Sequence, residues 1–468
     1  MTATVPGVGE VSAPAAAAPH AVARLGSQGW PSLGRAYYTV FVLALVIMFA
    51  EVDRGVMSLL VQAIKKDLHL SDTSMSWLLG LAFGLFYAAF GLPLARFIDR
   101  NNRKKILAVA LAVWSVATIF CGLAQNYMQL FFARLFLGAG ESVNGPSTFS
   151  MISDSFPKER LPRAIALMQL GLTAGAGFSL IMGALVIKLL INMPDLHVPI
   201  VGVVRWWQMV FIVLGIPGLL VALLLALTVK EPARRGLLEV GATDRVGLWQ
   251  TLIYAFQHWR VFGPVLGSLG ISALSMGTLA WGPAFLQRTY GWSPQRVGFT
   301  TGTLSLIATP IGLFGGVWVY ERLVKAGRVD APMQVVVWGR LVALPAAILM
   351  PLMPNAWLAV GLSAFSALML GFTGASQNAI LQIVTPNQMR GQMTAIQMFL
   401  FSVVGQAISP SIIALITDYG FRDESQIRYA MLTATLLFTP ASLFVFWLGV
   451  KPYAREVERL DAARVAPA

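Results

Sequence analysis

Four ionisable side chains stand inside long apolar runs of this chain: Asp53, Arg54, Arg134 and Glu141. A charged side chain at the centre of a bilayer costs roughly 2.5–3.5 kcal/mol on insertion scales, so it is retained where it meets a partner or a watery cavity. Burial and a neighbouring arginine act on a carboxyl group in opposite directions, and together they can leave it exchanging protons near neutral pH. The four residues therefore indicate a site that takes up and releases protons inside a membrane.

Sequence spacing sorts these residues into two pairs. Arg134 and Glu141 are seven residues apart, so two helical turns place them on one face, about 10.5 Å apart along the axis. Asp53 and Arg54 are adjacent, and Glu51 lies three residues before Arg54. A proton carrier with an electrostatic gate is one interpretation of these pairs. The other is a set of structural acid–base locks that only offset the cost of their own burial.

The elements that must position these residues are membrane-spanning helices. The chain is 57% hydrophobic and 12% charged, whereas a soluble domain carries about 25% charged residues. Its length and apolar content suit about twelve spans of roughly 20 residues. We therefore predict an all-α membrane protein with spans near 37–63, 75–98, 104–124, 128–152, 162–191, 206–228, 260–287, 296–320, 332–352, 355–379, 389–417 and 428–450.

The longest polar stretch, from Lys230 to Arg260, divides the spans into two sets of six. Short basic loops recur in both sets at offsets of roughly 222 and 229 residues, as in transporters built from internal repeats with a site between them. We predict two pseudo-symmetric six-helix bundles, joined by a cytoplasmic linker and flanked by a disordered N-terminal tail and a C-terminal tail that begins as a short helix. The boundaries are 1–35 for the first tail, 36–229 and 260–450 for the bundles, 230–259 for the linker and 451–468 for the second tail.

Basic residues predict the orientation of the spans. With the N-terminus inside, about 23 of the 34 Lys and Arg residues fall on the cytoplasmic side, about 8 outside and about 3 within spans. The reverse orientation inverts that ratio. We therefore expect a multi-pass protein of the cell membrane with both termini in the cytoplasm.

Several classes of function are excluded by what the chain lacks. Its net charge of +13 comes from short loops rather than from a basic stripe with interleaved aromatics, so we expect no nucleic-acid partner. Cys121 is the only cysteine and the four histidines are scattered, so no metal site or cofactor is expected. No nucleophile–base pair, phosphate-binding glycine loop or sizeable soluble domain is present, which argues against an enzyme, an ATP-driven pump and a receptor. We expect a monomer.

A basic loop follows the second predicted span. It resembles the cytoplasmic loop motif of the major facilitator superfamily, which runs Gly, three residues, Asp, Arg, any, Gly, any or Arg, basic; here alanine and asparagine replace its glycines. The resemblance implies a charge-relay latch at a cytoplasmic gate that favours the outward-open state, although the loop also reads as a simple topology signal. The latch residues would be Asp99, Arg100, Arg103 and Lys104.

Within that superfamily the first half is similar to the Spinster-like transporters, whereas the second half matches only generically. The similarity rests on an ordered series of motifs: Asp53-Arg54, 64–72, 84–87, 91–96, Gly140-Glu141 with Pro146, and 152–160. The same set of buried charges also resembles organic-anion:proton symporters. The charges therefore mark proton coupling more surely than they mark a substrate.

The Spinster-like resemblance implies alternating access for lipid-like anions such as lysophospholipids or sphingoid phosphates, coupled to protons. Glu141 would be the protonation switch, Asp53 and Arg54 would gate and couple, and Arg134 would set the charge of Glu141 or meet an anionic group. A phosphate or carboxylate would suit Arg54 or Arg134. The substrate contacts that we expect are Arg54, Arg134, Tyr87 and Gln397. A symporter of sugar acids and a drug:proton antiporter remain as alternatives.

The predicted spans of the second half offer a contrasting wall. The seventh, tenth and eleventh spans of the chain carry serine, threonine and glutamine, and the tenth has no ionisable residue. Such a wall opposite a charged one suits an amphipathic solute, although these residues more often pack helices. Arg340, in the ninth span, receives no role from the sequence. Gly315-Gly316 in the eighth span is a candidate for close helix contact or bending.

Overall fold

The computed structural model describes residues 30–157, 160–199, 201–234 and 247–465. Most of the predicted first tail, part of the linker and the last three residues lie outside these ranges. The described chain is almost entirely helical apart from a short antiparallel hairpin of β1 (Leu196–Val198) and β2 (Gly202–Val204). The expectation of an all-α membrane fold is therefore confirmed.

The helices of the first half follow the predicted spans, with some spans built from more than one helix. Their bounds are α2 (Leu33–Leu59), α3 (Val61–Leu68), α4 (Asp72–Ser76), the π-helix η1 (Trp77–Leu81), α5 (Ala82–Arg100), α6 (Arg103–Leu123), α7 (Tyr127–Glu141), α8 (Asn144–Ser153), α9 (Leu161–Leu190) and α10 (Trp206–Thr228).

The second half opens with a helix inside the predicted linker and closes with the helix expected in the second tail. Its elements are α11 (Leu248–Gln257), α12 (Trp259–Leu274), α13 (Gly277–Tyr290), α14 (Pro294–Lys325), α15 (Ala331–Leu349), η2 (Met350–Leu352), α16 (Ala356–Val384), η3 (Asn387–Met389), α17 (Arg390–Leu400), η4 (Phe401–Ile408), α18 (Ser409–Leu415), η5 (Ile416–Phe421), η6 (Glu424–Gln426), α19 (Ile427–Leu448) and α20 (Val450–Val465).

Ten helical segments of the described chain are long and apolar enough to cross a membrane. The two remaining predicted spans, α2 and α7–α8, are not among the ten. The first contains Asp53 and Arg54, and the second contains Arg134 and Glu141. Because α2 contains 27 residues, it reaches about 40 Å, enough to cross a bilayer. Ten and two together match the twelve predicted spans.

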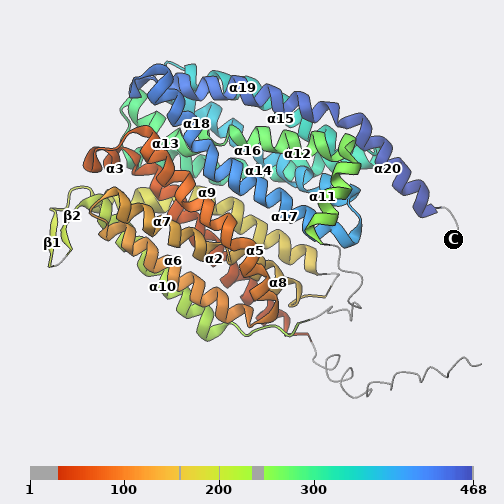
Figure 1. Ribbon diagram of the computed structural model, residues 1–468, viewed down its shortest axis with the longest axis horizontal. Helices are drawn as coiled ribbons and strands as arrows, with labels where there is room; N and C mark the ends of the chain where they lie inside the picture. The colour runs from red at the N-terminus through yellow and green to blue at the C-terminus, as the bar shows by residue number, and fades with distance from the viewer. Residues whose placement is uncertain (1–29, 158–159, 200, 235–246, 466–468) are drawn as a thin grey trace, which may run out of the picture.

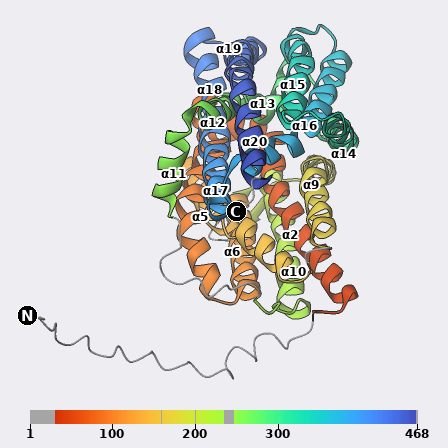
Figure 2. The same ribbon diagram turned by 90° about the vertical axis from the view of Figure 1, so that its right-hand side faces the viewer.

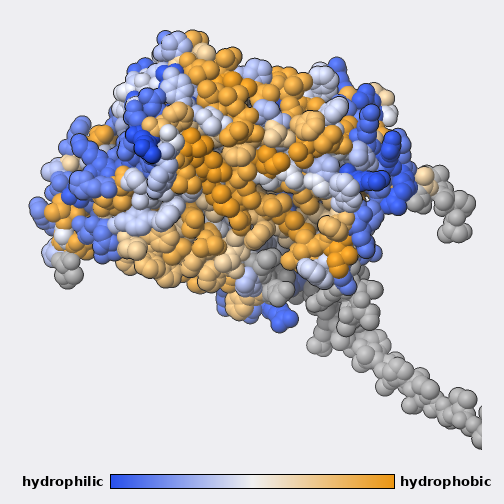
Figure 3. All heavy atoms as spheres, turned by 45° about the horizontal axis from the view of Figure 1, so that its top comes forward, coloured by the Kyte–Doolittle hydropathy of each residue, from blue (hydrophilic) through white to orange (hydrophobic). Residues whose placement is uncertain are grey.

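The two halves are stacked against one another in Figures 1 and 2, the first in red to yellow-green and the second in green to blue. Figure 3 shows a broad apolar band between two polar ends. Large apolar side chains such as Phe136 and Leu227 are exposed on outer helices, which is the pattern of a surface that faces lipid rather than water. The band fixes the membrane-crossing direction along the helices.

The two ends of the molecule are distinguishable in Figure 1. We call the end with the β1–β2 hairpin the hairpin end, and the opposite end, where α2 begins and α20 lies, the terminal end. Helices α9 and α14 join the halves along one side through glycines: a Cβ atom added at Gly302 would lie 2.7 Å from the carbonyl oxygen of Gly177. Side chains at these positions would force the halves apart.

Adjacent glycines in α14 differ sharply in their surroundings, which gives a test of helix packing. A Cβ atom at Gly316 would lie 1.9 Å from the carbonyl oxygen of Phe372 in α16, whereas one at Gly315 would meet only a ring carbon of Phe372 at 3.7 Å. We expect Gly316→Ala to destabilise the protein by about 1–3 kcal/mol through overpacking. Gly315→Ala gains the same helix propensity without the clash and should unfold at or above the wild-type temperature. Equal melting of the two variants in detergent would contradict this packing.

Candidate functional site

The centre of the site is an arginine held by two carboxylates. Arg54 of α2 donates from Nη2 to Glu141 Oε2 at 2.6 Å and from Nη1 to Glu51 Oε1 at 3.0 Å. The Glu141 side chain is fully buried, while those of Arg54 and Glu51 keep 28% and 18% of their exposure. The cluster thus joins the first predicted span to the fourth, and its exposed edge is on the α2 side.

The sequence of α7 explains why Glu141 reaches this position. A Cβ atom at Gly138 would lie 2.3 Å from the carbonyl oxygen of Phe83, and one at Gly140 would lie 2.9 Å from Cβ of Trp114. Glycine therefore lets α7 approach α5 and α6 closely. The helix then ends at Glu141 and resumes at Asn144 as α8, where the proline two residues further on cannot donate a backbone hydrogen bond.

Arg134 lies in the same pocket but does not contact Glu141. Its Nε donates to the carbonyl oxygen of Leu78 at 3.2 Å, and its side chain is almost fully buried. Both arginines lie over the Phe83 ring, whose centroid is 4.9 Å from the guanidinium carbon of Arg54 and 5.5 Å from that of Arg134. Each guanidinium is thereby stabilised by the face of the ring.

Asp53 points to a different side of α2 from Arg54. It lines a cavity of about 10 Å³ together with Trp114 and Thr118 of α6 and residues of α10, a volume near the minimum that holds one water molecule. Thr118 is its nearest hydrogen-bonding side chain, and Glu141 and Arg134 act on it electrostatically across the pocket. Asp53 is therefore part of the same charged region without sharing an ion pair with Arg54 among the described contacts.

Three buried polar atoms of this cluster have no hydrogen-bond partner within the described structure: Glu141 Oε1, Arg134 Nη1 and Arg54 Nε. Tyr87 stands one turn after Phe83, with ring centroids 5.6 Å apart, and its hydroxyl lies within electrostatic reach of Arg54 and Glu141. The site therefore combines an unsatisfied acid oxygen and unsatisfied cation donors with aromatic faces. Such an arrangement can bind a proton, an anion or both.

Gln397 belongs to the second half, away from the cluster around Arg54. It is buried in α17 and donates from Nε2 to Asn378 Oδ1 of α16 at 2.9 Å. Asn378 is exposed and follows Gln377, which accepts from Nη2 of Arg340 at 3.1 Å. The second half thus has a polar cluster of its own, made of amides and one arginine.

The predicted latch residues lie at the terminal end. Arg103 is buried and bonds Asp154 of the α8 C-terminus and, from Nε at 2.8 Å, Glu231 after α10. The backbone N–H of Lys104 donates to the same Glu231 at 2.7 Å. Arg100 is exposed, and the side chain of Asp99 lies outside the described part of the structure. In this structure Arg103 therefore fastens helices of the first half to one another.

The halves themselves are fastened at the hairpin end by a network that the sequence reasoning missed. Asp72 of α4 accepts from both terminal nitrogens of Arg288, each at 2.6 Å, and also bonds Lys65. Glu424 lies 2.9 Å from Lys65 Nζ. Nearby, Asp418 accepts from the backbone and hydroxyl of Thr73, both at 2.7 Å. Described ion pairs between the halves occur at this end, whereas those of Arg103 stay within the first half and the segment after α10.

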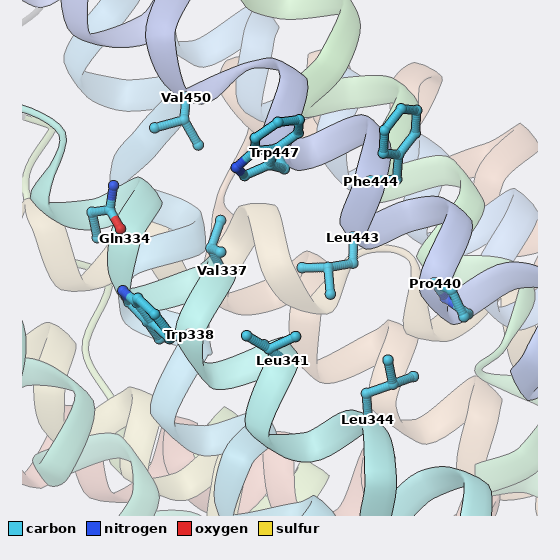
Figure 4. Close-up of a pocket in the computed structure, with 10 residues that line it drawn as sticks. All are labelled: Gln334, Val337, Trp338, Leu341, Leu344, Pro440, Leu443, Phe444, Trp447 and Val450. Atoms are coloured by element: carbon cyan, nitrogen blue, oxygen red, sulfur yellow. The ribbon is translucent and has the colours of Figure 1, made fainter.

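A separate groove on the outer face of the second half does not take part in this site. It has a volume of about 440 Å³ and lies between α15 and α19. Figure 4 shows Trp338 and Leu341 on one side and Leu443 and Trp447 on the other, with Gln334 near one end. Because its lining is apolar and it opens on the lipid-facing surface, it suits hydrocarbon chains of the bilayer.

Comparison with known proteins gives consistent results. The family model described as Major Facilitator Superfamily matches residues 43–410. An MFS-type efflux pump of Mycolicibacterium smegmatis is 28% identical over 90% of this chain and 94% of its own length. A probable L-galactonate transporter of Escherichia coli is 25% identical over 81% of this chain and 83% of its own length.

Among solved structures, a bacterial homologue of the human lysosomal transporter Spinster, in an inward-facing and unoccupied conformation, superposes with a TM-score of 0.73. It covers 94% of this chain and all of its own, at 22% sequence identity. At that identity the match establishes a shared fold.

Proposed function

The chain belongs to the major facilitator superfamily, and from that premise we propose that it is a proton-coupled transporter of amphipathic, lipid-like anions. The family and the relatives are membrane transporters rather than enzymes. Proton coupling and the chemistry of the substrate are our inferences from the site. The observation that carries them is the buried bond between Arg54 and Glu141.

This bond couples protonation to anion binding. When Glu141 is ionised, it occupies Arg54, and the anion of a solute must compete with it. A proton added to Glu141 removes that negative charge, weakens the charge-assisted bond and frees Arg54 for a phosphate or carboxylate. Asp53 and Arg134 set the local charge, while Phe83 and Tyr87 offer an apolar surface beside it. We retain Gln397 as a contact from the other half.

Alternating access requires that the two ends open in turn. We place the terminal end in the cytoplasm, because the positive residues concentrate in the loops there. On that assignment, the network of Asp72, Arg288 and Lys65 closes the outer face in this structure. In the outward-open state we assign the closing role to the latch of Asp99, Arg100, Arg103 and Lys104.

Three substrate classes compete. The structural likeness to a Spinster homologue and the wall formed by α16, which contains no ionisable residue, favour lysophospholipids or sphingoid phosphates. The likeness to a probable L-galactonate transporter favours small sugar acids, and the likeness to an efflux pump favours drug:proton antiport. We favour the lipid-like class because aromatic side chains flank the charges of the first half.

A thermal-shift screen in detergent tests the substrate class. We expect an oleoyl lysophosphatidate to raise the unfolding temperature at pH 5.5 more than at pH 8, since a protonated Glu141 leaves Arg54 free. Galactonate and glucuronate at matched concentrations should give no comparable shift. Stabilisation by the sugar acids with none by lysophospholipids would instead favour the symporter of small organic anions.

A further inference from the structure

Arg340, a cation of the second half, pairs with no carboxylate among the residues that the structure describes. Arg340 lies nine residues into α15 and its guanidinium passes between α12 and α16. It donates from Nη1 to Ser268 Oγ at 2.9 Å and from Nη2 to Gln377 Oε1 at 3.1 Å, and it lies 5.1 Å from the centre of the Phe446 ring. All three neighbours are neutral.

The helix of Arg340 and the three helices that its side chain contacts contain no acidic residue. Neither α12, α15, α16 nor α19 includes Asp or Glu, and no ion pair of Arg340 occurs among the described residues. Arginine stays protonated in proteins, and an uncompensated charge away from bulk water is costly. A structural role alone gives no reason to retain this charge.

The geometry leaves room for an anion to supply the missing charge. The guanidinium has five N–H groups, of which Ser268 and Gln377 take one each. Arg340 is half-buried, so it is shielded from bulk water without being sealed. Asn378, beside Gln377, is exposed and bonded to Gln397. The remaining donors of Arg340 thus adjoin a polar surface of neutral amides that can accept and donate hydrogen bonds.

The two arginines of the first half are less available to an anion. Arg54 is already bound by two carboxylates, and Arg134 is 1% exposed. Ionised Glu51 and Glu141 already balance the charges of those two arginines, so the first half offers no excess positive charge at that site. An anionic group therefore finds a more favourable potential in the second half.

We propose that Arg340, with Ser268 and Gln377, binds the phosphate or carboxylate of the transported solute. This assignment rests on the proposed transport of anions. It gives the anion a site in the second half while ionised Glu141 occupies Arg54, the first-half site that becomes free for an anion once Glu141 is protonated. The solute would then bridge the two halves, with its charge at Arg340 and its apolar part toward the aromatic side chains of the first half. Loss of the proton from Glu141 would restore a negative charge in the first half, on the wall that faces the bound solute.

The test compares charged and uncharged ligands that share an apolar part. Binding of oleoyl lysophosphatidate is measured against that of monooleoylglycerol by thermal-shift titration, and glucuronate against glucose covers a small-anion substrate. In Arg340→Gln we expect the preference for the charged member to fall about tenfold or more, because a charged hydrogen-bonding partner is lost. Arg340→Lys keeps the positive charge but loses the paired N–H donors of the guanidinium, so its preference for the charged ligand should lie between those of the wild type and Arg340→Gln. Arg322→Gln, which removes an exposed cation beside Trp318, should leave the preference unchanged.

Stability of the ligand-free protein separates binding from structure. Since Arg340 is unpaired, Arg340→Gln should unfold at or above the wild-type temperature and still bind monooleoylglycerol. A full charge preference in Arg340→Gln, or a large drop in its ligand-free stability that Arg340→Lys restores, would overturn the assignment. The proposed proton coupling is scored separately in Glu141→Gln: pH dependence that persists in that variant would contradict the coupling role of Glu141, whereas a lost charge preference in Arg340→Gln would still support this anion site.

Discussion

Replacing Glu141 by glutamine should abolish the pH dependence of transport and leave the protein folded. Glutamine has the size of glutamate and can still accept a hydrogen bond from Arg54, so the contact between α2 and α7 is kept. It cannot ionise, so Arg54 is permanently in the state that we assign to the protonated transporter. In proteoliposomes, we expect a pH gradient to change wild-type flux by about tenfold, within the range usual for coupling between two ligands, and the flux of Glu141→Gln by less than about twofold.

Glu51 provides the matched control for this experiment. Its carboxylate also bonds Arg54, but it retains some exposure and adjoins the same helix rather than joining two spans. We expect Glu51→Gln to remain pH-dependent. Exchange of labelled solute without a gradient should persist in Glu141→Gln, since that reaction needs no net proton movement. A pH-dependent Glu141→Gln, or loss of the dependence in Glu51→Gln instead, would move the proton site elsewhere.

Much of the fold was predictable because hydrocarbon imposes a simple rule on sequence. A span must be long, apolar and internally hydrogen-bonded, so the runs and the polar stretch between the sixth and seventh were readable directly. Helix α11 was missed inside the predicted linker. Its apolar side chains recur at helical spacing, and Trp249, Ile253 and Phe256 are exposed on it. That periodicity was a usable signal for a helix at the membrane surface.

The site was less predictable than the spans that carry it. The spacing places Arg134 and Glu141 in one helix, where both side chains are buried, but it cannot say which neighbour each side chain meets. Arg134 turns to the Leu78 carbonyl, and it is Arg54, 87 residues away, that reaches Glu141. Such pairings depend on how closely helices approach, which here follows from the glycines facing Phe83 and Trp114. No local pattern in the sequence reports that distance.

The ion-pair network at the hairpin end was even harder to predict from the sequence than the buried site. Asp72 opens a short helix, a common place for an acidic residue, and its partner Arg288 is 216 residues away. Arg288 ends a helix, which is equally common for a cation. Each residue therefore has an ordinary local explanation, and only the packing of the halves shows that their side chains meet across the interface.

That network leads to the second large expected effect: Asp72→Asn should open the hairpin end. Asp72 is fully buried, and the side chains of Lys65 and Arg288 are only 5% and 7% exposed. Removing the carboxylate leaves Lys65 and Arg288 with the half-exposed Glu424 as their remaining acid. Breaking a buried ion pair in this way costs about 3–5 kcal/mol. The cost falls on the closed conformation, because opening lets both cations hydrate. The open population should rise roughly a hundredfold or more.

Cysteine labelling in detergent measures this shift without assuming an orientation in the membrane. Ser76 is buried between the halves, where it bonds Ser411 at 3.1 Å. A maleimide should therefore modify Ser76→Cys, in a Cys121→Ala background, only when the hairpin end opens. Asp72→Asn should accelerate the labelling strongly. Asp67→Asn is the control, since it removes an acid at the same end whose partner Arg205 lies in the same half. Equal labelling rates in the two variants would contradict a gate at Asp72.

A second substitution separates gating from general loosening. If the closed state is weakened because Arg288 loses Asp72 and keeps only the more distant Glu424, 3.6 Å away, then adding Arg288→Gln to Asp72→Asn removes part of that cost. The double variant should label more slowly than Asp72→Asn alone, although it lacks one more side chain of the original network. General loosening predicts the opposite order, since each lost contact would add to the damage. The sign of the coupling between positions 72 and 288 therefore decides whether this buried charge cluster controls the opening of the transporter or only supports its fold.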